Sequence, residues 1–217
     1  MADDFEERAP GTNLRTEAAQ VLRELGHQMT SHSIDEALLE RIVEAVTRFR
    51  DEVAAGEPRS RGPMDRFHDA GVDEENRGLF PDSIVSGIDN PMGINARMIR
   101  DGDEAVLRAT LRSAHQGAPG RAHGGIVAAM FDEAMGLVIS MMQVMAFTGW
   151  LKVTYRAGTP LHEELEIRAR MTGKAGRKIS MTAELTDAAG TLIAEAEALF
   201  IEVDVEKFLK LAEEMGA

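Results

Sequence analysis

The residues best placed to do chemistry are two adjacent acids, Asp132 and Glu133, in a stretch that is otherwise apolar or small from Gly124 to Met142. Because no polar stripe runs along this stretch, a helix formed by it would be buried around most of its circumference. A carboxylate in such a helix is costly unless something compensates it. Asp132 is therefore a candidate base or nucleophile, since the alternative role of stabilising the helix dipole fades beyond the first turn. Glu133 would point about 100° away around the helix, and we expect it to be a salt-bridged or rim residue.

The start of the same stretch offers a second kind of group. It begins with His123, Gly124 and Gly125, and the glycines leave the first backbone N–H groups of the helix unobstructed. Such a helix start is a ready anion site. Gly124 is therefore the candidate donor to an oxyanion. For His123 two roles stay open, because the ring can orient the loop or can simply be satisfied in the core.

The distance between the two candidate groups along the helix predicts a site shared between subunits. Gly124 and Asp132 are eight residues apart in the sequence. This spacing corresponds to about 12 Å of rise, so one carbonyl carbon cannot lie near both groups of one helix. If both act on one substrate, they come from different subunits. A two-fold dimer with antiparallel central helices provides this arrangement.

Composition limits the classes of partner and chemistry. The chain has 217 residues and a net charge of -13, which argues against nucleic acid or an anionic membrane surface as the main partner. It contains no cysteine, so disulfides and thiolate chemistry are excluded. His27 and His32 do not share a helix face, so no metal site is expected, and no cofactor is predicted.

The acidic N-terminus lacks an apolar signal region, so we expect a cytoplasmic protein. The paired acids argue against a membrane span.

Hydrophobic periodicity places a helical arm before the main domain. Apolar residues recur at helix spacing from Leu14 to Met29 and again from Leu38 to Val53, and Ser33 with Glu36 matches a capping box between them. A Gly- and Pro-rich segment follows the arm. The predicted organisation is a disordered tail, the helical arm, a linker, the main domain and a C-terminal helix, at residues 1–12, 13–55, 56–82, 83–205 and 206–217.

The main domain reads as strands, one long helix and then a strand meander. Period-two alternation and turn residues predict strands at 83–88, 94–99, 105–111, 147–156, 164–172, 177–187 and 191–203. A single helix buried on most sides must be wrapped by the sheet. The predicted class is α+β, with an antiparallel sheet around one central helix and an N-terminal helical extension.

This order, with its motifs, resembles the hotdog-fold acyl-CoA thioesterases over about residues 80–203, and most closely the phenylacetate-type branch. The resemblance rests on PGRAHGGIVAAMFDEAMG at residues 119–136, AFTGWLKVTYR at 146–156, GRK at 176–178 and EAEALF at 195–200. The helical arm lies outside the resemblance. Some relatives carry an Asn or Gln where this chain has Gly117, beside Gln116, so that role is not carried over.

The resemblance implies a hydrolase that converts an acyl-CoA to a free acid and CoA, as a homodimer or a dimer of dimers. Asp132 would be the catalytic carboxylate, and Thr148 would assist it by holding water. The chain has no Gly-x-Ser-x-Gly elbow to supply another nucleophile. Two alternatives stay open, a hotdog-fold hydratase or dehydratase and a non-catalytic acyl-CoA sensor. The resemblance also implies cations that bind the CoA phosphates, and the candidates are Arg156, Lys174, Arg177 and Lys178. The alternative is that these side chains are simply solvated.

Overall fold

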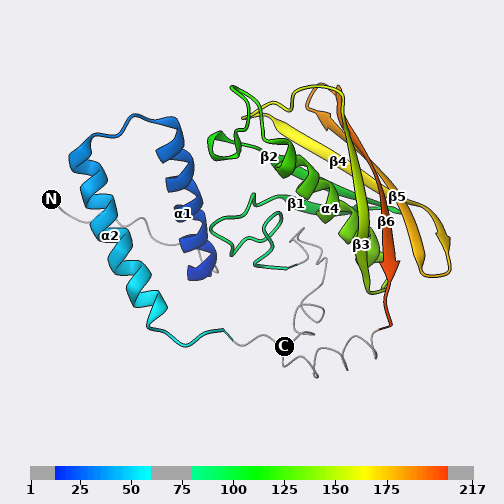
Figure 1. The fold of residues 1–217 in the computed structure, drawn as a ribbon, viewed down its shortest axis with the longest axis horizontal. Helices are drawn as coiled ribbons and strands as arrows, with labels where there is room; N and C mark the ends of the chain where they lie inside the picture. The colour runs from blue at the N-terminus through cyan, green and yellow to red at the C-terminus, as the bar shows by residue number, and fades with distance from the viewer. Residues whose placement is uncertain (1–12, 60–79, 205–217) are drawn as a thin grey trace.

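The computed structural model describes residues 13–59 and 80–204. The predicted tail at 1–12, most of the predicted linker and the predicted helix at 206–217 lie outside these residues. Within them the chain forms two N-terminal helices, a third long helix and a six-stranded sheet. Figure 1 shows the first two helices on one side of the molecule and the sheet with its helix on the other.

The sheet is antiparallel throughout, with the strand order β1-β2-β4-β5-β6-β3. Its inner face is apolar because side chains alternate along each strand, and Leu165, Ile167 and Ala169 of one strand are all fully buried. The strands are β1 (Arg97–Asp101), β2 (Glu104–Thr110), β3 (Ala146–Tyr155), β4 (Glu164–Ala175), β5 (Lys178–Asp187) and β6 (Leu192–Glu202).

The central helix is α4 (Gly124–Met141), which lies along the sheet as Figure 1 shows. Phe131, Met135 and Leu137 are fully buried against the strands. By length and composition α4 could also span a membrane, with a mean hydropathy of 1.5 and 44% of its residues buried inside the structure. Its apolar character is explained by burial against the sheet. The predicted architecture of a sheet wrapped around one helix, with a helical extension, is confirmed.

The predicted strand at 83–88 is wrong, and the first strand begins at Arg97 rather than at residue 94. The segment before β1 is a series of turns, closed by bonds such as Gly87 N to Ser83 O at 3.2 Å. A Cβ on Gly87 would lie 2.4 Å from the Ser83 backbone, so only glycine permits this close turn. The apolar residues there reflect burial of a loop, and Val85 is only 2% exposed.

The arm consists of α1 (Leu14–Ser31) and α2 (Glu36–Ala54). The helix start predicted from the capping box is displaced, because the N-cap of α2 is Asp35, whose side chain accepts a hydrogen bond from Leu38 N. An isolated pair of short helices is only marginally stable, and among the described residues of the arm only those of α1 include buried side chains. None of the residues of α2 is buried.

Polar contacts attach α1 to the main domain. Arg112 makes two hydrogen bonds with the carboxylate of Glu24, at 2.6 and 2.7 Å, and these bonds lower the pKa of Glu24 to about 2. Arg23 donates to the carbonyls of Ile88 and Asn90 at 3.1 and 2.6 Å. At the N-terminal end of the helix, the Thr16 hydroxyl donates to Asp89 at 2.6 Å. The attachment of α1 therefore depends on directional bonds.

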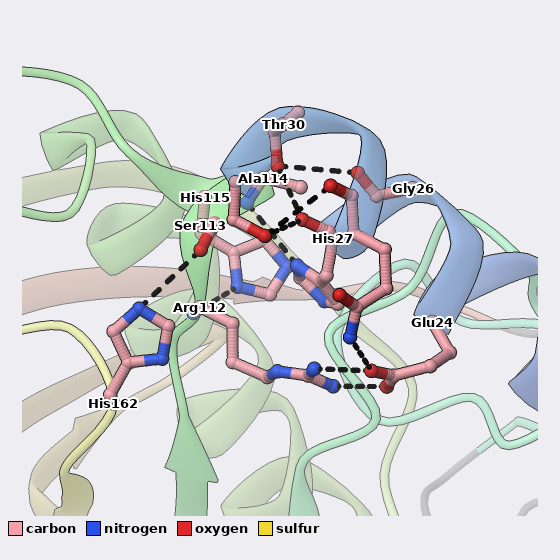
Figure 2. A network of polar contacts seen from close by, with 11 residues as sticks. Glu24, Gly26, His27, Thr30, Arg112, Ser113, Ala114, His115 and His162 are labelled. Carbon is pink, nitrogen blue, oxygen red and sulfur yellow. Dashed lines mark hydrogen bonds and ion pairs between the residues drawn. The ribbon is translucent and has the colours of Figure 1, made fainter. Parts of the chain in front are cut away.

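Two buried histidines complete the attachment, as Figure 2 shows. His27 Nδ1 lies 3.2 Å from the donating Ala114 N, and His115 Nδ1 lies 3.0 Å from the donating Arg112 N. The rings meet edge to face with their centroids 4.8 Å apart. Because each Nδ1 accepts a backbone proton, each neutral ring carries its own proton on Nε2. Burial lowers the pKa of both rings, that of His115 to about 4.

The buried His115 makes stability depend on pH. Burial, with smaller contributions from His27 and Arg112, lowers its pKa from 6.5 to about 4 in the folded protein. Between these values the unfolded chain binds more protons, so we expect the free energy of unfolding to fall as the pH is lowered across this interval. His115→Asn should weaken this fall, because its Oδ1 can accept the same backbone bond without titrating. Urea unfolding of both proteins at about pH 7 and about pH 5 tests this, and equal pH dependence would contradict it.

Candidate active site

Asp132, in the middle of the central helix, forms a polar pair with Thr148 of β3. Asp132 is half-buried on α4, and the Thr148 hydroxyl donates to its Oδ1 at 2.7 Å from β3. The pairing of β3 with β6 shifts register between Thr148 and Trp150, a bulge of the kind that redirects side chains. The hydroxyl fixes one carboxylate oxygen, which leaves Oδ2 to take a proton from a water molecule. The two residues predicted to act together do lie together.

Removing the Thr148 hydroxyl is expected to lower kcat more than it raises KM. The hydroxyl contacts Asp132 and orients the carboxylate that we expect to act in the chemical step. We expect Thr148→Ala to lower kcat about tenfold or more, while Thr148→Ser, which keeps a hydroxyl, retains most of it. Steady-state kinetics of the three proteins are the measurement. A change in KM alone would place Thr148 in substrate binding.

The start of α4 has one unused backbone donor. His123 is the N-cap, its ring Nδ1 accepts from Gly125 N at 3.0 Å, and its carbonyl accepts from Ile126 N at 3.0 Å and Val127 N at 3.3 Å. Gly124 N donates to no acceptor in the part of the chain that the structure describes. The cap therefore occupies the neighbouring amides and leaves that of Gly124 for a ligand. Of the two roles open for His123, the structure shows an exposed cap that orients the helix start.

Tyr155 also lies at this helix start, and sequence reasoning assigned it no role. Its hydroxyl donates to the Gly124 carbonyl at 2.6 Å. A Cβ on Gly124 would lie 3.2 Å from the Tyr155 ring, so the close approach favours glycine at this position. Burial raises the pKa of Tyr155, which keeps the phenol protonated as a donor. The only signal in the sequence is its place in the motif at 146–156.

Two further positions differ from what the sequence indicated or left open. Glu133 has no salt bridge among the described residues, and its Oε1 accepts from the hydroxyls of Ser83, at 2.6 Å, and Ser86. It therefore fastens the loop before β1 to α4.

A side chain at residue 117 has no room, because a Cβ on Gly117 would lie 2.8 Å from the His123 Cα.

The four cations expected at CoA phosphates divide between the two ends of the sheet. Lys174, Arg177 and Lys178 gather at the β4–β5 hairpin, where Lys174 pairs with Glu202 at 2.7 Å and Arg177 donates to the Glu202 carbonyl at 2.7 Å. Arg156 follows the far end of β3 and pairs with Glu195. One chain therefore does not bring all four cations together.

The candidate groups line up along the edge of the sheet. Within residues 13–59 and 80–204, β3 pairs with β6 alone and is an edge strand. Gly124 lies beside Tyr155 at the end of β3, and Asp132 lies beside Thr148 near its beginning. The two predicted centres are thus separate within one chain. Among residues 13–59 and 80–204, no three His, Cys, Asp or Glu side chains are grouped to hold a metal ion.

Part of the chain matches known proteins in sequence. Residues 119–194 match the family profile described as "Thioesterase superfamily". Acyl-coenzyme A thioesterase THEM4 of Mus musculus is 36% identical over 94 residues, which cover 42% of this chain and 40% of that protein. The Bos taurus protein of the same name is 28% identical over 144 residues, which cover 65% of this chain and 60% of that protein. The matches therefore span less than two thirds of these relatives.

A solved structure shows the same fold over nearly the whole chain. The crystal structure of a protein described as a thioesterase superfamily protein matches with a TM-score of 0.77 and 23% identity, covering 89% of this chain and 97% of that one. At this identity the likeness shows the fold alone. The hotdog fold predicted from the sequence is confirmed.

Proposed function

We propose that this chain, whose residues 119–194 match the thioesterase superfamily, hydrolyses an acyl-CoA to a free acid and CoA. The observation that carries the proposal is the Asp132–Thr148 pair, with its 2.7 Å hydrogen bond beside an otherwise apolar helix. The names of the partial relatives in Mus musculus and Bos taurus support the substrate class.

The chemistry follows from the two centres. In one route Asp132 takes a proton from water, and the water oxygen attacks the thioester carbonyl carbon. In the other route the Asp132 carboxylate attacks directly and water then hydrolyses the resulting anhydride. In both routes the carbonyl oxygen becomes negative, the free Gly124 amide stabilises it, the C–S bond breaks and the CoA thiolate takes a proton.

The proposed site is shared by two copies of the chain. Within one chain Gly124 and Asp132 are about 12 Å apart along the helix axis, so they cannot flank one carbonyl. Among the described strands β3 lies at the edge of the sheet, and Trp150 and Tyr155 are each 49% exposed on it. Large apolar residues on an unpaired edge favour association with another strand. Antiparallel pairing of two β3 strands would place the helix start of one protomer near Asp132 of the other.

The same dimer would bring the cations from the two ends of the sheet close to one another. The hairpin at residues 174–178 lies at the Asp132 end of β3, and Arg156 lies at the Gly124 end. Reversing one protomer against the other brings the partner's Arg156 toward this hairpin. We propose that the phosphates of CoA lie between these groups, where cations in an acidic protein would attract them.

One assay separates this function from its rivals. Purified protein is mixed with a panel of aryl and alkyl acyl-CoAs that includes an enoyl-CoA. Release of free thiol is followed for every member, and the absorbance of the enoyl group is followed for the enoyl-CoA. A thioesterase releases thiol, a hydratase consumes the enoyl group without releasing thiol, and a sensor does neither although it binds. No thiol release from any member of the panel would reject the proposal.

A further inference from the structure

We infer that Glu24 and His27 of helix α1 are positioning residues for the active site, acting through the turn at residues 112–117 on the N-cap His123. This inference rests on the proposed role of the Gly124 amide. No role for the arm follows from the sequence, and the family profile, which matches residues 119–194, does not reach it. The hydrogen bonds of α1 reach the loop before β1 and the turn at residues 112–117, and the turn is the element that leads into the N-cap His123.

The first link joins the arm to the turn. Glu24 and His27 are three residues apart and lie on one face of α1. Glu24 holds the guanidinium of Arg112 with two bonds, and His27 accepts from Ala114 N. Figure 2 shows both side chains reaching the start of η1 (Ser113–His115) from the same helix.

The second link joins the turn to the catalytic helix. The carbonyl of His115 accepts from His123 N at 2.9 Å. Gln116 forms an antiparallel bridge with Ala122, and Gly117 N donates to the Arg121 carbonyl at 2.9 Å. The turn is therefore bonded along its length to the residues that lead into α4.

Packing leaves little freedom between the turn and the cap. A Cβ added to Gly117 would lie 2.8 Å from the His123 Cα and 3.2 Å from its ring. Backbone and ring are thus in direct contact, and a shift of the turn displaces His123. Such a shift would redirect the cap bond to Gly125 and the peptide that presents Gly124 N. An oxyanion donor depends on its aim, so displacement would lower kcat.

The contact between α1 and the main domain is better suited to positioning the turn than to stabilising the whole domain. Only Ala19 and His27 of α1 are buried, so the helix adds little to the hydrophobic core. Its contacts are hydrogen bonds that fix direction and distance. Without His27, the amide of Ala114 loses its acceptor, and the turn loses this anchor to α1.

The test compares His27→Leu with a control on the same helix. His27→Leu removes the acceptor for Ala114 N, while Thr16→Val removes a different anchor of α1, the bond to Asp89, and leaves the turn untouched. We expect His27→Leu to lower kcat about tenfold with little change in KM, and Thr16→Val to leave kcat within about twofold. His27→Asn, whose Oδ1 can replace the acceptor, should restore most of the rate.

A readout independent of turnover is the rate of amide hydrogen exchange at the start of α4. The amides to follow are those of Ile126 and Val127, which donate to the His123 carbonyl. Exchange should be faster in His27→Leu and unchanged in Thr16→Val. Glu24→Gln, which keeps a neutral acceptor, is the milder second variant if His27→Leu does not fold, and should shift both readouts in the same direction.

The outcomes distinguish this inference from the proposed function. If the folded variants leave kcat and exchange unchanged, or if Thr16→Val changes them as much, the positioning role is wrong while the proposed function stands. If wild-type protein releases no thiol but His27→Leu still speeds exchange, the proposed function is wrong and the coupling of α1 to the helix start stands.

Discussion

Asp132→Asn should lose almost all thioesterase turnover, about 10²- to 10⁴-fold, while folding and acyl-CoA binding stay largely intact. Asparagine has the same size, and its side-chain oxygen can still accept the Thr148 hydroxyl. It can neither take a proton from water nor attack a carbonyl as a carboxylate does. The chain has no cysteine to replace it. The measurement is kcat, with the unfolding transition and the acyl-CoA dissociation constant as checks.

The neighbouring acid provides the matched control. Glu133 accepts its bonds from Ser83 and Ser86, and glutamine keeps an acceptor oxygen for them. Glu133→Gln therefore removes the same charge one residue away and should keep most of the turnover. If Asp132→Asn retains activity within about threefold of wild type, an effect under about 1 kcal/mol, Asp132 is not the catalytic carboxylate.

Two inactive variants should restore activity when they are mixed. Asp132→Asn lacks the carboxylate, and Gly124→Pro lacks the amide proton proposed as the oxyanion donor. In a mixed dimer one site carries both lesions and the other carries neither. When half of the dimers are mixed, about a quarter of wild-type activity should return after refolding together. The measurement is thiol release by the mixture and by each variant alone.

The backbone conformation at Gly124 is compatible with proline, so Gly124→Pro can remove the amide proton and keep the start of the helix. Gly124 is the first residue of α4, where proline is tolerated, and His123 has the extended conformation that proline requires before it. The added atoms press on Tyr155, so Gly124→Ala, which adds Cβ but keeps the amide proton, is the control and should retain more activity. A mixture that stays inactive although both variants fold and exchange subunits would rule out the cross-subunit site.

The sequence was sufficient for features whose signal is local. Apart from Asp132 and Glu133, the central helix is apolar or small because it is buried against a sheet, and α4 begins at Gly124 as predicted and ends at Met141, one residue before the end of the predicted stretch. The alternation in β4 predicted the buried positions Leu165, Ile167 and Ala169, whereas Met171, the next apolar residue in the alternation, is 44% exposed. Sequence also brought Asp132 and Thr148 together, through the resemblance of the motifs to known enzymes.

Features set by distant contacts could not be predicted in this way. The apolar residues near Val85 read as a strand, although the close contact at Gly87 folds them into turns beneath α4. The bond between Tyr155 and Gly124 joins residues that only the fold brings together. The same holds for Glu24 and Arg112, which are 88 residues apart in the sequence. Periodicity shows which face of a helix is apolar, but it does not show what a polar face contacts.

The central claim is that this protein hydrolyses acyl-CoA with Asp132 as the catalytic carboxylate. The most direct measurement follows free thiol and free acid together, for wild type and Asp132→Asn, with the acyl-CoA that the panel shows to be the best substrate. The account predicts one acid for each thiol with wild type and almost neither with the variant. Equal release by the two proteins, or loss of acyl-CoA without release of thiol, would contradict it.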